Sequence, residues 1–164
     1  MKTRMYCIVN QYISGIHAGI QSAHAIHEMF IKYPQRTSNA SNLLWDWASE
    51  DKTIIVLDGG YQQRMFEMID LMEGIKSLPH SYFCEEEDAL NGALTAVAIV
   101  LPEYMYTPQY YGEAAADPLS GVVKVEPRVS NDYRDPLTGN VIHRYTQHEK
   151  NLIAEIKRLK LKGA

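Results

Sequence analysis

The sequence predicts an α/β protein in which a β-sheet lies between two layers of helices. Over about the first hundred residues, apolar strand-like stretches alternate with amphipathic helical stretches, which is the order expected of such a fold. With 46% hydrophobic and 22% charged residues in 164, the chain has an ordinary globular composition and is long enough for one well-packed domain. After residue 103 tyrosines and turn residues become frequent, so we expect an extension to follow that domain.

Four strands and three helices are expected before the extension. Residues 4–10 predict a buried strand, because apolar and β-favouring side chains follow one another without Gly or Pro. Residues 17–33 predict a helix, because apolar residues recur there at spacings of three or four. The other expected elements are a short helix that Ser41 caps, an amphipathic helix over 61–75 and strands over 53–57, 80–84 and 94–101.

Charge and targeting signals limit the partners. No apolar run approaches the ~18 residues of a membrane span, and no signal peptide is recognisable, so we expect a cytoplasmic protein without a membrane partner. Cys7 and Cys84 lie within expected strands and predict two buried thiols rather than a disulfide. A formal net charge of −4 argues against binding nucleic acid over the whole surface, so phosphate binding requires a local basic patch.

The extension, residues 104–164, is expected to hold a tyrosine-rich arm, a hairpin with its tip at residues 135–140, and a helix over 146–161. The arm contains Tyr104, Tyr106, Tyr110 and Tyr111. These side chains either stack on a nucleotide base or pack the arm against the domain or a second subunit, and we favour packing. We accordingly expect a homo-oligomer that forms through the extension.

Polar residues gather where the first strand gives way to the first helix. Gln21 and His24 lie about one turn apart among small residues, and buried polar side chains of this kind are costly unless they are used. His17 and His27 project close to His24, towards the sheet edge where α/β proteins bind ligands. The alternative without a functional role is that His24 hydrogen-bonds to a backbone carbonyl and His27 is exposed to solvent. Without a Cys-x-x-Cys or His-Glu-x-x-His motif we expect no metal site.

Several short motifs of the first part resemble the peptidyl-tRNA hydrolase II family. Residues 21–25, Gln-Ser-Ala-His-Ala, match the second half of the Gly-Lys-x-Ala-Ala-Gln-x-x-His-Ala helix start of that family. Residues 95–102, Thr-Ala-Val-Ala-Ile-Val-Leu-Pro, are similar to its last strand, and Trp47, a strand and a helix correspond in order between them. The resemblance covers residues 5–102. It implies a three-layer α/β sandwich with a four-stranded mixed sheet over residues 1–103, to which this chain adds a C-terminal extension with a hairpin and a helix.

The resemblance also implies an activity, since the family cleaves the ester that joins a peptide to tRNA. Its active site uses a Lys at the helix start, an Asp in an Asp-Ala-Gly loop and the Thr of the last strand. The Lys position holds His17, the Thr position holds Thr95, and the Asp position holds Asp88 or, by strand register, Glu86. Water would then attack the ester with help from Glu86 or Asp88 and no cofactor, while Asn10, Gln21 and His24 bind the ligand.

The residue at position 17 keeps two function classes open. A Lys is permanently charged, whereas a His is about half charged near its ordinary pKa of ~6.5, so tRNA phosphates would be bound less strongly. The alternative is a non-catalytic binding module of the same fold that holds a nucleotide, RNA or protein partner, for example a viral sequestering protein. A third hypothesis is an oligomeric structural protein. Thr95 and the acidic residues 85–88 likewise have ordinary alternatives, as a β-favouring residue and a solvated loop.

Overall fold

The computed structural model describes residues 1–111, 116–117, 121–122 and 127–163. Its centre is a four-stranded sheet in the order β2-β1-β4-β3. The strands are β1 (Thr3–Asn10), β2 (Ile54–Gly60), β3 (His80–Cys84) and β4 (Leu94–Pro102). β1 runs parallel to β2 and antiparallel to β4, and β3 runs antiparallel to β4. The predicted α/β fold with a mixed four-stranded sheet is therefore confirmed.

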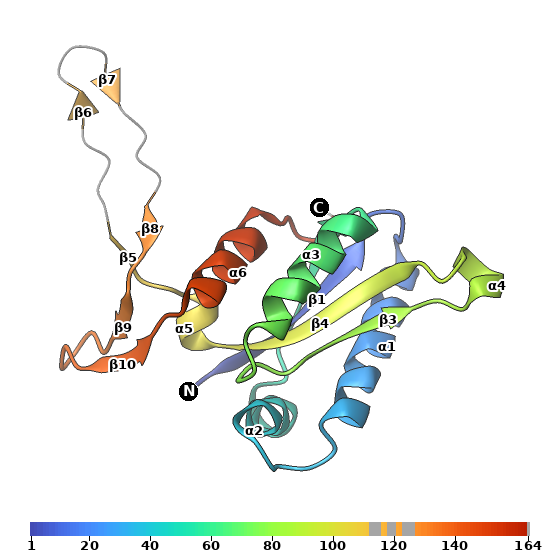
Figure 1. The fold of residues 1–164 in the computed structure, drawn as a ribbon, viewed down its shortest axis with the longest axis horizontal. Helices are drawn as coiled ribbons and strands as arrows, with labels where there is room; N and C mark the ends of the chain where they lie inside the picture. Colours follow the sequence, from blue (N-terminus) through green and yellow to red (C-terminus); the bar gives the residue numbers. More distant parts are fainter. Residues whose placement is uncertain (112–115, 118–120, 123–126, 164) are drawn as a thin grey trace.

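Helices cover both faces of this sheet (Figure 1). One face carries α1 (Ile16–Lys32), α2 (Asn39–Asp46) and a π-helical turn, η1 (Trp47–Asp51); the other carries α3 (Gln62–Glu73) and α6 (Gln147–Arg158). α2 begins slightly earlier than the sequence indicated, because Ser38 rather than Ser41 is its cap. The Ser38 side chain accepts a hydrogen bond from the Ser41 backbone N–H, and the Ser41 side chain accepts one from the Ser38 backbone N–H, which completes a capping box.

The alternation of side chains along β1 divides the core in two. Met5, Cys7 and Val9 pack with α1 and α2, whereas Tyr6 and Ile8 pack with α3 and α6. β4 is buried along its whole length, as expected of a central strand covered on both faces. Burial raises the pKa of the Cys7 thiol to about 12, and both cysteines are free thiols.

Small residues bring α1 close to the sheet. Ala18 and Ala25 of the helix are buried against the same cluster as Ala96 and Ala98 of β4. Gly19 does not take part, because it is exposed and a Cβ added there would meet nothing within 4 Å. The close contact therefore depends on alanines rather than on the glycine of the helix start.

A single helical turn, α4 (Glu87–Leu90), connects β3 to β4. After β4 the extension begins with α5 (Glu103–Tyr106) and continues through short strands. The strands pair as antiparallel ladders: β5 (Tyr110–Tyr111) with β8 (Arg128–Val129), β6 (Ala116–Asp117) with β7 (Gly121–Val122), and β9 (Asp132–Arg134) with β10 (Val141–Arg144). The predicted hairpin tip joins β9 to β10, where the Gly139 backbone N–H donates to the Asp135 carbonyl.

The C-terminal helix belongs to the main core. A capping box of Thr146 and Glu149 starts α6, and Leu152 and Ile153 are buried in the same cluster as the α3 methionines. Tyr104 of α5 stacks on His143 of β10 with 3.9 Å between ring centroids, which joins the arm to the β9–β10 hairpin. Within the described part of the chain, no helix is both long and apolar enough to cross a membrane.

Candidate functional site

Two β-bulges shape the sheet edge at which β1 ends and β4 begins. The register between β1 and β2 shifts after Val9, and the register between β3 and β4 shifts after Phe83. At the second bulge Phe83 pairs with Ala96 and Cys84 with Leu94, so Thr95 is the extra residue. Bulges re-aim side chains and are frequent beside functional sites. This edge also receives the start of α1, and we treat it as the candidate site.

Gln21 of α1 joins Thr95 to the chain that follows β3. The Thr95 hydroxyl donates to Gln21 Oε1 at 2.8 Å, and Gln21 Nε2 donates to Glu85 Oε1 at 2.7 Å. Gln21 is 7% exposed and Thr95 is 1% exposed, whereas Glu85 is half-buried. We call these three side chains the Gln21 network. Because Glu85 is the least buried of the three, its carboxylate is the group that solvent or a ligand can reach.

The protons of the Gln21 network have one consistent arrangement. An ionised carboxylate only accepts hydrogen bonds, so the amide nitrogen of Gln21 must face Glu85 and its oxygen must face Thr95. Thr95 has a single hydroxyl proton, and it donates to Gln21 over the shorter distance, the Phe83 carbonyl being 3.3 Å away. Thr95 can therefore only accept a hydrogen bond from a water or a ligand. Among the described residues, the second oxygen of Glu85 has no hydrogen-bond partner.

Asn10 holds the edge together from the end of β1. Its side-chain amide donates to the Leu94 carbonyl at 3.1 Å, and its oxygen accepts from the Tyr12 backbone N–H at 3.1 Å. Lys162 supports the same turn by donating to the carbonyls of Asn10 and Gln11, each at 3.2 Å. Asn10 thus fixes the first residues of β4 beside Thr95, and its expected ligand-binding role stays a prediction.

The three histidines of α1 are all exposed, but their surroundings differ. His24 stacks on Phe83, the residue at the bulge, with 4.4 Å between ring centroids and 12° between ring planes. His17 lies one helical turn before Gln21 on the same face, at the start of α1. Among the described residues, no three His, Cys, Asp or Glu side chains are placed to hold a metal ion.

The acidic member of the network is Glu85, which strand register did not indicate. Glu86 and Asp88 are exposed at the start of α4 and within it, and within the described residues neither side chain hydrogen-bonds to Gln21. The bulge at Thr95 adds a residue to β4 only and so shifts the pairing by one. Counting an unbroken strand register therefore leads to the wrong neighbour. The signal that could have identified Glu85 is its position directly after the strand, before α4 begins.

Large apolar side chains stand exposed around the start of α1. Tyr12, Ile16 and Ile20 lie on the turn and the first helical residues, and Tyr61 lies beside Tyr12 with 6.0 Å between ring centroids. An apolar surface next to a polar network suits a ligand with an apolar group beside a polar one, such as an acyl or aminoacyl group.

Neither a comparison with models of known protein families nor one with curated proteins finds a match for this chain.

Proposed function

We propose that this chain is a divergent peptidyl-tRNA hydrolase-like protein whose site holds an aminoacyl or peptidyl ester of tRNA. The observation that carries the proposal is the Gln21 network, in which a glutamine of the resembling helix motif binds the threonine of the resembling last strand. The exposed apolar residues at the start of α1 would hold the acyl group, and the tRNA end would lie along the helix start, beside His17.

In this proposal Glu85 is the general base. Its free oxygen takes a proton from a water molecule, while the Gln21 amide holds the other oxygen in place. The water oxygen attacks the ester carbonyl carbon, and collapse of the tetrahedral intermediate breaks the bond to the ribose oxygen. That oxygen takes the proton from Glu85 and leaves as a hydroxyl, which restores the Glu85 carboxylate. Thr95 accepts a hydrogen bond that orients the reacting water. His17 is exposed at the start of α1, where its ring can donate a hydrogen bond to a phosphate of the tRNA end.

Turnover of a peptidyl-tRNA by the full chain and by paired variants tests this assignment. Glu85→Gln removes the base but keeps the size of the side chain and is expected to lower kcat at least a hundredfold. Glu87→Gln makes the same charge change on the exposed turn and is expected to leave kcat within twofold. Equal rates for wild type and Glu85→Gln, or a loss with Glu86→Gln instead, would contradict the role of Glu85.

A non-catalytic binding module is the second candidate. It is favoured by the hydrogen bonds within the network, because one carboxylate oxygen of Glu85, the Gln21 amide and the Thr95 proton already have partners there. A module of this kind would hold a nucleotide, RNA or protein partner at the same edge without cleaving it. Retained binding of peptidyl-tRNA with no release of peptide by wild type would select this candidate over the hydrolase.

We further propose that the chain acts in the cytoplasm as a homo-oligomer formed through the extension. Exposed apolar side chains support this contact, since Leu137, Val141 and Ile142 lie uncovered on the β9–β10 hairpin. Light scattering of the full chain across a hundredfold concentration range measures the mass directly. A monomer mass throughout would reject assembly, and an oligomer that Ile142→Lys returns to monomer would support the hairpin as the contact.

A further inference from the structure

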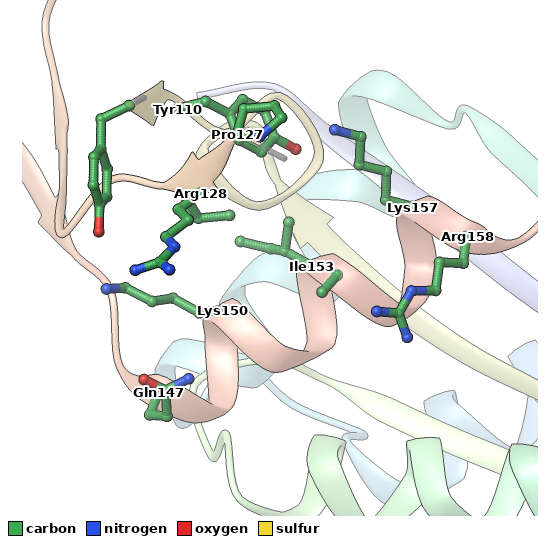
Figure 2. A pocket seen from close by; sticks show the side chains of 11 residues that line it. Tyr110, Pro127, Arg128, Gln147, Lys150, Ile153, Lys157 and Arg158 are labelled. Atoms are coloured by element: carbon green, nitrogen blue, oxygen red, sulfur yellow. The ribbon is translucent and has the colours of Figure 1, made fainter. Parts of the chain in front are cut away.

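The strands β5 and β8 and the helix α6 enclose a pocket that the Gln21 network does not use (Figure 2). Its volume is about 670 Å³, within the range of small-molecule sites. Tyr110 and Arg128 line it from the two strands, and Lys150, Ile153 and Lys157 line it from the helix. We call it the α6 pocket.

Positive charge is concentrated in the α6 pocket. Its cationic residues are Arg128, Lys150, Lys157 and Arg158, and none of the described residues that line it carries a carboxylate. The whole chain carries a formal net charge of −4, so this surface differs in sign from the protein around it. Such a local basic patch is what phosphate binding requires of an acidic protein.

Most of these cations are not neutralised by the protein. Within the described residues, Arg128, Lys150 and Lys157 form no ion pair, while Arg158 pairs with Glu155 at 3.0 Å. Lys150 donates to Asn131, which is uncharged. In Figure 2 the charged ends of Arg128 and Lys150 point to the same side of the pocket. Like charges that point to one side of the pocket from two different elements favour an anionic ligand bound between them.

The spacing along α6 exceeds the reach of a single phosphate. Lys150 and Lys157 are seven residues apart on one face of the helix, and a rise of 1.5 Å per residue places them about 10 Å apart. Each therefore reaches a different phosphate. The pattern fits a ligand with at least two phosphate groups, either a nucleoside polyphosphate or a stretch of nucleic-acid strand.

An aromatic wall accompanies the charges. The Lys157 ammonium lies 4.3 Å from the centroid of the Tyr110 ring, and Tyr110 is 38% exposed. A second, apolar hollow of about 350 Å³ shares Tyr110, Ile153 and Lys157 with the α6 pocket and continues towards Met105 and Pro108. A tyrosine beside a lysine is the arrangement on which nucleic-acid bases stack while their phosphates are bound.

We propose that the α6 pocket binds nucleoside phosphates, with the phosphates on Arg128, Lys150 and Lys157 and a base on Tyr110. This binding does not depend on the proposed ester chemistry, since no residue of the Gln21 network lines the pocket. A nucleoside phosphate can come from an RNA strand or from a free nucleotide, and both present the same groups to these side chains.

Fluorescence anisotropy with a labelled ten-nucleotide single-stranded RNA, titrated with the full chain at several salt concentrations, tests the proposal. Arg128→Ala combined with Lys150→Ala is expected to raise Kd at least tenfold and to reduce the salt slope by about 1.4, at about 0.7 per lost phosphate contact. Tyr110→Leu is expected to raise Kd about tenfold with little change of slope. Lys2→Ala combined with Lys76→Ala removes the same charge from exposed positions elsewhere and is expected to change Kd less than twofold.

Competition separates the sources of the ligand. Displacement of the RNA by ATP at micromolar concentration identifies a free-nucleotide site, and displacement only by unlabelled RNA identifies a strand site; either result supports the pocket. Equal losses for the pocket and control variants, or displacement by polyglutamate as efficient as by RNA, would overturn it. Turnover of peptidyl-tRNA by the Gln21 network is measured separately, so failure of one proposal is distinguishable from failure of the other.

Discussion

Replacing Gln21 with Glu tests the geometry of the network without changing its size. The substitution sets a second carboxylate against Glu85, where the amide nitrogen now lies 2.7 Å from the acceptor oxygen. Two unit charges about 4 Å apart near a protein surface repel by roughly 4 kcal/mol. That repulsion raises the pKa at which the pair loses its last proton above the ordinary range of a carboxylic acid.

The sign of the pH dependence follows from this raised pKa. Below pH ~4.3 a proton bridges the pair in the folded state, and the Gln21→Glu variant keeps most of the wild-type free energy of unfolding. As the pH rises from the ordinary carboxyl range through the raised pKa of the pair, the unfolded chain releases its protons first, so stability falls progressively and then levels off. We expect a loss of about 3–4 kcal/mol relative to wild type at pH 8 and below about 1 kcal/mol at pH 4.5.

Equilibrium unfolding in urea, followed by tryptophan fluorescence at each pH, measures the difference from wild type. Gln21→Met is the matched control, because it removes both hydrogen bonds at every pH and is expected to cost about 2–3 kcal/mol without pH dependence. A Gln21→Glu variant that loses the same free energy of unfolding at pH 4.5 and at pH 8 would show that Glu85 is not held against residue 21.

Three further predictions concern the fold. Gly59→Ala is expected to lower the free energy of unfolding by about 1–3 kcal/mol, because the added Cβ would lie 2.7 Å from Ile8. Gly19→Ala, whose Cβ would meet nothing within 4 Å, is expected to raise it by about 0.5–1 kcal/mol. Urea unfolding of both variants measures the difference. Leu152→Ala is expected to cost about 2–5 kcal/mol in one transition shared by fluorescence and circular dichroism; a separate early transition of the extension would contradict its place in the core. Since burial raises the pKa of the Cys7 thiol to about 12, a thiol reagent at pH 8 is expected to modify it only at the rate of unfolding, and fast modification in native buffer would be the opposite result.

The sequence predicts the central sheet well because its signals are local. Each strand of the first part is a short apolar run, and the alternation along β1 explains why both faces are covered by helices. The link between Gln21 and Thr95 was also accessible, through two motifs that resemble the same family. Neither inference requires knowledge of distant contacts beyond the order of the elements.

The remaining features depend on contacts that the local pattern does not contain. The bulge at Thr95 shifts the register between β3 and β4 by one residue, so that Glu85 rather than Glu86 hydrogen-bonds to Gln21. No residue type in the sequence indicates this bulge. The apolar stripe of α6 was recognisable, but its partner, α3, begins 85 residues earlier in the chain, at Gln62 rather than near Gln147. The α6 pocket likewise joins Arg128 to lysines of a separate helix.

Single-turnover cleavage tests the central claim most directly, that the Gln21 network hydrolyses an ester of tRNA. The full chain in excess is mixed with an N-acetylated aminoacyl-tRNA, and release of the amino acid is followed against the same reaction without protein. Wild type is expected to release the N-acetylated amino acid, Glu85→Gln to release it at least a hundredfold more slowly, and Glu87→Gln to match wild type. No release above the protein-free rate at saturating protein would contradict it.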